Sequence, residues 1–377
     1  MIKPHGGELI NRYFDKSEFD LEFENLNSIK INSSILCDCE MIANGGFSPL
    51  KGFMNKSEIE NVCENLKLNN NLIWAIPVFL PVLKSQNFKV GEYVKLINED
   101  EKVIGLVKID ENFELDLDYL CEHIFGTNDL NHPGVKVVKS YSGNFVSGDI
   151  FIFEKLIINS VDCKYQLSPK QVRDKFIESG VDTVVAFQTR NPIHRAHEYI
   201  IKTAMEPYDA CLIHPLIGTT KSDDIKEDVR MDCYKVLIDN YFKTDNTFLS
   251  TLSNAMRYAG PKEAILHLII RQNYGCSHMI IGRDHAGVGD YYGTYQAQEL
   301  VREYIDELEI KPIFFEHAFY CKVCKNVATS KTCPHTGENL LHLSGTKVRE
   351  MLSCSIKPPK EFSRDEVAEI LINSYKK

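Results

Sequence analysis

Two histidines, His194 and His197, stand three residues apart shortly after a largely apolar, β-branched run at 181–187. Such a run is typical of a strand in a buried parallel sheet, and ligands bind beyond the carboxyl ends of these strands. Arg190 lies between the run and the histidines. Two histidines can also simply fill polar positions of a helix, but Arg190 and Pro192 beside them favour an anion-binding site.

The residues after this strand also predict where a helix begins. Asn191 is a good N-cap residue and Pro192 is favoured at the first helical position, so we expect a helix that starts at Pro192. The free N–H groups of a helix N-terminus attract phosphate. His194 and His197 would then lie on one face of the first turns, close to the bound anion.

Other charged loops follow the remaining strand candidates. Residues 282–287, Gly-Arg-Asp-His-Ala-Gly, come directly after an apolar run at 278–282. Arg257 precedes a Gly-Pro turn, and Lys221 could add a cation, although a solvated lysine is an equally good interpretation. A solvated turn is the alternative for each loop taken alone. Two charged loops at strand ends of one domain favour a convergent anion site.

A cysteine cluster predicts a metal site. Cys321, Cys324, Cys333 and His335 offer four ligands within fifteen residues, and the spacing fits a closed tetrahedral zinc site of structural type. His342 is the alternative fourth ligand. A redox pair or free thiols remain the other interpretation.

The secondary structure that the sequence predicts around these residues changes along the chain. Residues 26–158 read as short strands and turns with few helical periods, which predicts a β-rich domain. Ser168 and Pro169 begin a helical pattern, after which strands and helices alternate as in a doubly wound α/β fold. The tail at 345–377 carries two short helical patterns and predicts a small terminal subdomain.

The chain of 377 residues is long enough for two or three domains, and no apolar run approaches the length of a membrane span. The N-terminus has no secretory signal, so we expect a cytoplasmic protein. Its net charge of −10 argues against general affinity for nucleic acid. The Walker pattern of phosphate-binding loops is absent.

The loops at 188–197, 254–261 and 282–287 together resemble the signature of the ATP sulfurylase family, in a form with a zinc-binding insertion. Residues 40–54 and 343–349 resemble its amino- and carboxyl-terminal motifs. The resemblance implies an α/β protein with a β-rich N-terminal domain. Its three parts would be a PUA-like β-barrel at 1–165, a Rossmann-like nucleotidylyltransferase domain at 166–318, and the zinc insertion with a small C-terminal subdomain at 319–377.

The resemblance also implies a role for each matching residue. Sulfate would contact Gln188, Arg190 and the backbone around Ala286. The residues that would carry catalysis are Thr189, Arg190, Asn191, His194 and His197. The residues that would bind ATP are Gln188, Arg190, Asn191, Pro192, Ile193, His194, His197, Gly282, Arg283, Asp284, His285 and Phe319.

The reaction implied by the resemblance is in-line attack of sulfate on the α-phosphorus of ATP, which forms adenylyl sulfate and releases magnesium-bound pyrophosphate. The same residues would catalyse the reverse reaction, so the direction of use stays open. The family suggests a homo-oligomer, with a dimer favoured, and a structural role for zinc.

Two other functions compete with this interpretation. Another nucleotidylyltransferase could use the same histidine pair, but a large nucleotide acceptor would not need the sulfate-sized cationic pocket of residues 188–191. A non-catalytic RNA- or partner-binding protein could use the β-rich domain and the zinc insertion. The acidic balance and the complete nucleotide motif argue against it.

Overall fold

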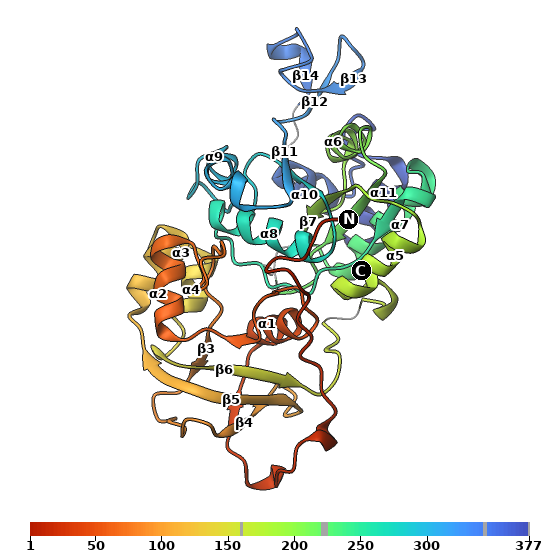
Figure 1. The fold of residues 1–377 in the computed structure, drawn as a ribbon. Helices are drawn as coiled ribbons and strands as arrows, with labels where there is room; N and C mark the ends of the chain where they lie inside the picture. The colour runs from red at the N-terminus through yellow and green to blue at the C-terminus, as the bar shows by residue number, and fades with distance from the viewer. Residues whose placement is uncertain (159–160, 220–224, 342–344, 376–377) are drawn as a thin grey trace.

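The computed structural model of the protein describes residues 1–158, 161–219, 225–341 and 345–375. Figure 1 shows a β-rich N-terminal part, a central part built on a parallel sheet, and a small three-stranded lobe that projects from the far end of the central part. The N-terminal and central parts lie against each other. This arrangement agrees with the predicted change from a β-rich part to an α/β part along the chain.

The N-terminal part contains one six-stranded sheet in the order β1-β4-β5-β6-β2, with β3 also paired to β6. Burial alternates along β4, where Val94 and Leu96 are buried between half-buried neighbours, as expected for a strand with one face on a core. The strands are β1 (Ser28–Lys30), β2 (Gly52–Phe53), β3 (Leu80–Val82), β4 (Tyr93–Ile97), β5 (Val103–Glu114) and β6 (Asn144–Ile152).

The expectation of few helices in this part was wrong, because four helices join the strands. They are α1 (Ser33–Ala43), α2 (Lys56–Asn65), α3 (Leu117–Phe125) and α4 (Pro133–Val138). Each begins after a polar residue whose side chain accepts a hydrogen bond from a backbone N–H of the first turn. Short helices with Asn, Asp or His caps have the same composition as turns, so their sequence resembles that of loops.

The central part contains five parallel strands in the order β11-β10-β7-β8-β9. The chain runs outward from β7 through β8 to β9, and then crosses to the other side of β7 for β10 and β11. Ligands of such sheets bind where the strand order reverses, here between the carboxyl ends of β7 and β10. The strands are β7 (Val184–Thr189), β8 (Ala210–Pro215), β9 (Thr247–Leu249), β10 (His278–Ile281) and β11 (Lys311–Phe314).

Helices connect these strands. The predicted start of the first one is confirmed, because Ser168 caps α5 and Pro169 is its first residue. The helices are α5 (Pro169–Glu178), α6 (Arg195–Met205), α7 (Glu227–Tyr241), α8 (Pro261–Asn273) and α9 (Gln296–Glu303). Every residue of α8 except Lys262 is buried, so this helix lies in the interior between the two large parts (Figure 1).

The C-terminal region has two separate pieces. The projecting lobe is a small antiparallel sheet of β12 (Phe319–Cys321), β13 (Asn326–Ala328) and β14 (Leu340–Leu341). The chain then returns to the central part, where α10 (Gly345–Ser353) is followed by α11 (Asp365–Tyr375), which packs against α7. Short 3-10 helices lie at Lys16–Glu18, Phe23–Asn25, Cys163–Tyr165, Thr244–Asn246, Ile305–Glu307 and Gly337–Asn339.

Buried polar contacts join the N-terminal and central parts. The side chain of Asn273, at the end of α8, donates to the carbonyl oxygens of Gly46 and Ser48 and accepts from the backbone N–H of His5. Asp38 on α1 pairs with Arg257, with 2.5 Å between carboxylate and guanidinium, and both side chains are largely buried. The two parts are therefore held together by groups that have little access to water.

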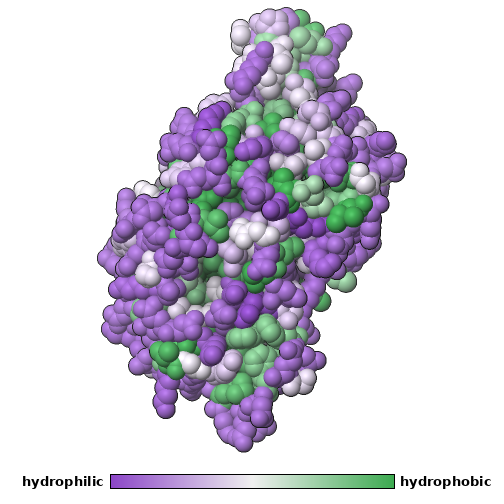
Figure 2. All heavy atoms as spheres, viewed as in Figure 1, coloured by the Kyte–Doolittle hydropathy of each residue, from purple (hydrophilic) through white to green (hydrophobic). Residues whose placement is uncertain are grey.

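The face of the molecule in Figure 2 is mostly hydrophilic, and its hydrophobic residues lie in small groups. Among the described residues, no helix combines the length and the apolar character that crossing a membrane requires.

The buried pair gives a first testable outcome. Asp38→Asn leaves the Arg257 charge buried without its counter-ion, so we expect the free energy of unfolding to fall by about 3 kcal/mol. The measurement is thermal unfolding by calorimetry. The matched control is Asp149→Asn, because Asp149 pairs with Arg12 at 3.3 Å but is 45% exposed, and such pairs contribute less than about 1 kcal/mol. An equal loss of unfolding free energy in the two variants would contradict this account of Asp38.

Candidate active site

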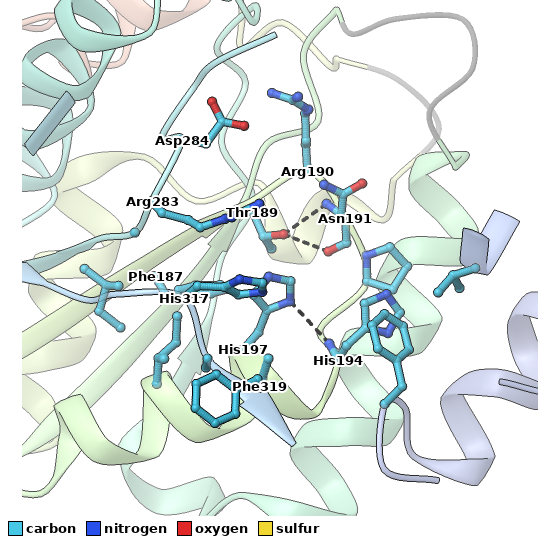
Figure 3. A pocket seen from close by; sticks show the side chains of 18 of the residues that line it. Phe187, Thr189, Arg190, Asn191, His194, His197, Arg283, Asp284, His317 and Phe319 are labelled. Carbon is cyan, nitrogen blue, oxygen red and sulfur yellow. Dashed lines mark hydrogen bonds between the residues drawn. The ribbon is translucent and has the colours of Figure 1, made fainter. Parts of the chain in front are cut away.

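A cavity of about 640 Å³ opens at the carboxyl ends of β7 and β10, at the position where the strand order reverses. Its walls come from the loop after β7 with the start of α6, the loop after β10, the strands of the projecting lobe, the helices α10 and α11 with the segment between them, and the residues Ile225 and Met256. Figure 3 shows Arg190, His194, His197 and Arg283 around this space. The two predicted loops therefore do converge.

The predicted start of α6 was wrong. The helix begins at Arg195, and His194 occupies the N-cap position. The reason lies in the turn before it, where the Thr189 hydroxyl accepts from the backbone N–H of Asn191 at 3.0 Å and donates to its carbonyl at 2.7 Å (Figure 3). Tyr234 donates to the same carbonyl at 2.8 Å. That oxygen is therefore not available to begin a helix.

The two histidines line the cavity at the N-terminus of α6. The Nδ1 atom of His197 accepts from the backbone N–H of His194 at 3.4 Å, so the neutral ring carries its proton on Nε2 and can donate from there (Figure 3). His194 packs against Phe362, with ring centroids 4.3 Å apart. Its Nδ1 atom is buried and has no hydrogen-bond partner among the described residues.

Both imidazoles are neutral at pH 7. Removal from water lowers the pKa of His194 to about 3, with a smaller contribution from His197. Burial also lowers the pKa of His197 to about 4, and His317 adds to the effect. A bound anion would oppose these shifts, because a negative charge nearby favours the protonated ring. The pair can therefore donate to phosphate oxygens as neutral groups or take up a proton on binding.

Arg190 lies in the loop after β7 and contacts two other loops, at Tyr258 and at Gly287. Its guanidinium stands over the ring of Tyr258, 5.0 Å from the centroid, and donates to the carbonyl of Gly287 at 3.4 Å. The Oε1 atom of Gln188 is buried and lacks a hydrogen-bond partner among the described residues. An arginine held by an aromatic ring and a nearby amide suit a small tetrahedral anion, because a guanidinium can bond two of its oxygens at once.

The loop after β10 has an uncommon backbone. Asp284 and Ala286 both have positive φ, at 51° and 56°, a conformation that costs energy in residues other than glycine. A Cβ atom on Gly287 would lie 2.1 Å from Oδ1 of Asp284, so a larger residue there would displace the Asp284 side chain. Such strain is concentrated at ligand sites. The two left-handed residues turn the backbone around Ala286 toward Arg190.

A buried chain of side chains stands behind His285, which lines the cavity. The Nε2 atom of His285 lies 3.1 Å from Nδ1 of His267, and Nε2 of His267 lies 3.5 Å from Oε1 of Glu263. The contact between His267 and Glu263 is electrostatic, because Nε2 of His267 has no hydrogen-bond partner among the described residues, and the closer contact is the one between the two imidazoles. Burial, with His267 close by, lowers the pKa of His285 well below its usual value.

The structure brings most residues of the predicted site together. Twelve of them line the cavity: Gln188, Thr189, Arg190, Asn191, Pro192, His194, His197, Gly282, Arg283, Asp284, His285 and Phe319. The backbone turn at Ala286 lines it as well. Ile193 is the exception, because the residue is 1% exposed and belongs to the hydrophobic core.

The structure does not place the two other candidate cations, Arg257 and Lys221, at the cavity. Arg257 does not reach the cavity, because it is paired with Asp38 at the boundary with the N-terminal part. Lys221 lies outside the described residues.

Sequence reasoning missed several residues of the site. Glu316, His317 and Tyr320 line the cavity from the start of the projecting lobe, and Phe362 does so from the C-terminal region. Their positions depend on packing between distant segments, and no motif marks them. Tyr258 could have been found, because it follows Arg257 in the loop that the sequence had already singled out.

The predicted metal ligands come together in the lobe. The ligand atoms of Cys321, Cys324, Cys333 and His335 all lie within 4.8 Å of one another. Sγ of Cys324 is 3.9 Å from Sγ of Cys333 and 3.3 Å from Nδ1 of His335. A tetrahedral zinc with Zn–S bonds of about 2.3 Å requires sulfurs about 3.8 Å apart, so the four residues fit this ion. His342, the alternative ligand, lies outside the described residues.

The fold and the site define an α/β nucleotide-binding protein of the nucleotidylyltransferase class, with an anion site at the strand-order reversal. The model of the ATP-sulfurylase family matches residues 163–374, and that of a PUA-like domain matches residues 2–155. The chain belongs to the ATP-sulfurylase family. The predicted family and the predicted succession of a PUA-like and a nucleotidylyltransferase domain are thus confirmed.

Relatives of similar length support the same assignment. The chain is 53% identical to the sulfate adenylyltransferase of Persephonella marina, over 99% of this chain and 98% of the relative. It is 48% identical to that of Synechocystis, over 99% and 97%. A solved structure, a hexameric APS kinase from Thiobacillus denitrificans, has the same fold with a TM-score of 0.78 at 20% identity, over 99% of this chain and 68% of that one.

The neutral histidines predict how stability depends on pH. The unfolded chain protonates histidine near pH 6.5, whereas folded His197 takes up a proton only near pH 4, so its contribution is complete above pH 6.5 and is lost as the pH falls toward 4. His197→Asn keeps an acceptor for the His194 N–H and removes the titration. We expect the fall of the unfolding free energy to become shallower by up to about 1.4 kcal/mol per pH unit. Calorimetry between pH 7 and 4.5 measures the unfolding free energy of both proteins. Equal slopes against pH for wild type and His197→Asn would contradict the lowered pKa of His197.

The metal cluster gives a separate expected outcome. Purified protein should contain close to one zinc per chain by elemental analysis, and Cys324→Ser should lower that content strongly because a structural site needs all four ligands. Cys354→Ser, an exposed cysteine outside the cluster, is the control and should keep the metal. A wild-type protein without zinc would refute the site.

Proposed function

We propose that this chain catalyses transfer of the adenylyl group of ATP to inorganic sulfate, forming adenylyl sulfate and pyrophosphate. The observation that carries the proposal is the meeting of Arg190 and Gln188 with the histidine pair in one cavity at the strand-order reversal. The name shared by the relatives, sulfate adenylyltransferase, supports the same reaction.

Sulfate would lie against Gln188, Arg190 and the backbone at Ala286. The guanidinium of Arg190 supplies a positive charge whose planar fork can bond two sulfate oxygens. The buried Gln188 amide would gain a partner on binding the anion. Sulfate is already ionised, so no general base is needed to make it a nucleophile.

ATP would place its phosphates at the N-terminus of α6. Nε2–H of His197 and the ring of His194 would donate to phosphate oxygens, and the side chains of Asn191 and Arg283 line the same space. The loop at 282–285 and Phe319 would contact the nucleoside. Thr189 would act through the turn that it holds together with Asn191.

The chemical difficulty is repulsion between two anions. Two unit charges about 4 Å apart repel by about 4 kcal/mol at an effective dielectric constant near 20. Arg190 would offset this on the sulfate side. The histidines and the helix N-terminus would stabilise the charge that grows on the α-phosphate as the sulfate oxygen attacks in line and the bond to pyrophosphate breaks.

Metal ions would have two separate roles. Magnesium would arrive with ATP and stabilise the leaving pyrophosphate. Zinc would be held by Cys321, Cys324, Cys333 and His335, where it would keep the lobe folded, and Phe319 and Tyr320 of that lobe line the cavity. The zinc site would therefore support the nucleotide pocket without taking part in the reaction.

We also propose a homo-oligomer, with a dimer as the first expectation, and three working units at 1–165, 166–318 and 319–377. The hexamer named for the Thiobacillus denitrificans protein supports assembly in general terms. A cytoplasmic location would agree with twelve cysteines that form no disulfides in the structure.

The experiment is an assay of sulfate-dependent pyrophosphate release from ATP with magnesium. Arg190→Lys should lower kcat/KM for sulfate at least about 100-fold, because a point charge cannot replace a planar fork that bonds two oxygens. The matched control is Arg302→Lys, because Arg302 also stacks on an aromatic ring, Phe314, but lies outside the cavity. Wild-type activity in Arg190→Lys, or no sulfate dependence at all, would refute the proposal.

A further inference from the structure

The N-terminal part contributes a buried histidine to the boundary beside the site. His132 has no exposed surface and caps helix α4. Its Nδ1 atom accepts from the backbone N–H groups of Gly134 and Val135, at 3.1 and 3.3 Å. Two donors point at this nitrogen, so it carries no proton. The ring is therefore neutral and its proton is on Nε2.

The proton on Nε2 has a specific partner in the central part. Nε2 lies 3.1 Å from the carbonyl oxygen of Tyr258, which can only accept, so His132 donates to it. The hydroxyl of Tyr292 lies 3.3 Å from the same nitrogen. Two segments 126 residues apart in sequence are thus joined by one hydrogen bond.

Tyr258 needs such support because its backbone has φ at +61°, which is unfavourable for a residue with a large side chain. The residue is 4% exposed, and its ring lies under the guanidinium of Arg190, 5.0 Å from centroid to Cζ. A change in the Tyr258 backbone would therefore move the surface on which Arg190 rests.

The rest of the Tyr258 loop is held just as closely. Glu263 accepts from the backbone N–H groups of Arg257 and Ala259, at 2.9 and 3.0 Å. The N–H of Gly260 donates to the carbonyl of Ala286 at 3.2 Å, so the same loop also supports the second sulfate-facing segment. On the other side, a Cβ atom on Gly134 would lie 2.5 Å from the carbonyl of Arg257, which shows how tightly the His132 turn packs here.

We infer that His132 is a positioning residue for the sulfate site: through the Tyr258 carbonyl it fixes the ring that orients Arg190, so the N-terminal domain sets the affinity for sulfate. The inference rests on the proposed function, because it takes Arg190 to bind sulfate. It assigns His132 no contact with either substrate.

Two substitutions separate the two nitrogens of His132. Asparagine can place its Oδ1 near the Nδ1 position and keep the cap, but it cannot reach Tyr258. Glutamine can place an N–H near the Nε2 position and keep the bond to Tyr258, but it weakens the cap. We expect His132→Asn to raise KM for sulfate about three- to tenfold, with KM for ATP nearly unchanged, and His132→Gln to stay closer to wild type.

If His132 acted only on stability, His132→Gln and not His132→Asn would have the higher KM for sulfate. His132→Gln weakens the cap and should have the lower melting temperature of the two variants. If KM for sulfate followed the melting temperature, or stayed at the wild-type value in His132→Asn, the inference would be overturned. The control is His123→Asn, because His123 also bonds a backbone carbonyl, that of Tyr119, in the same domain but away from the cavity.

A second variant covers the case in which the His132 variants do not fold. Tyr258→Leu removes the ring under Arg190 and should also raise KM for sulfate more than KM for ATP. If His132→Asn folds, the double variant should show less than the product of the two single effects, since both act on the same ring. Unchanged sulfate KM in Tyr258→Leu would contradict the inference. If the wild-type enzyme releases no pyrophosphate in response to sulfate, the proposed function fails instead.

Discussion

The site depends on one electrostatic constraint: an acidic protein must hold two anions in contact. With a net charge of −10, the chain provides no general attraction for sulfate or a triphosphate. The attraction has to be local. The parallel sheet supplies the place, because the loops after β7 and β10 meet where the strand order reverses. Both loops carry arginine there, and the N-terminus of α6 adds its free N–H groups.

Gathering anion-binding groups in one place requires energetically unfavourable features of the protein. His194, His197 and His285 are held neutral by burial, which lowers their pKa values, so the site does not accumulate positive charge on its imidazoles. Asp284 and Ala286 adopt left-handed backbone conformations to turn the second loop. These unfavourable features persist because the surrounding structure holds them in place, and bound anions would relieve part of them.

The support for the site comes from regions distant in sequence. The N-terminal part contacts the loop behind Arg190 through His132 and through the buried ion pair of Asp38. The projecting lobe places Phe319 and Tyr320 in the cavity wall next to its cysteine cluster. Glu263 and His267 hold His285 from within the buried helix α8. Among these groups, His132, Asp38, Glu263 and His267 do not line the cavity, so they would influence binding only through the residues that they hold.

Much of the protein could be predicted from sequence because the decisive signals are local. The β-branched run before Gln188, the cap at Ser168, and the charged loops after two strands all depend on neighbours in the chain. Their convergence follows from the general rule that parallel strands end at one edge. The cysteine spacing likewise specifies a metal site, since four ligands within fifteen residues can reach one ion.

Tertiary contacts decided the rest. Thr189 and Tyr234 occupy the Asn191 carbonyl, and for this reason α6 starts three residues later than its cap signals predict. Arg257 faces Asp38 and not the cavity, because a carboxylate 219 residues away is buried beside it. By itself the sequence determined which residue types gather at the sheet edge. Only the tertiary structure decided which side chains face the anions and which support them, because that choice depends on partners that are distant in the chain.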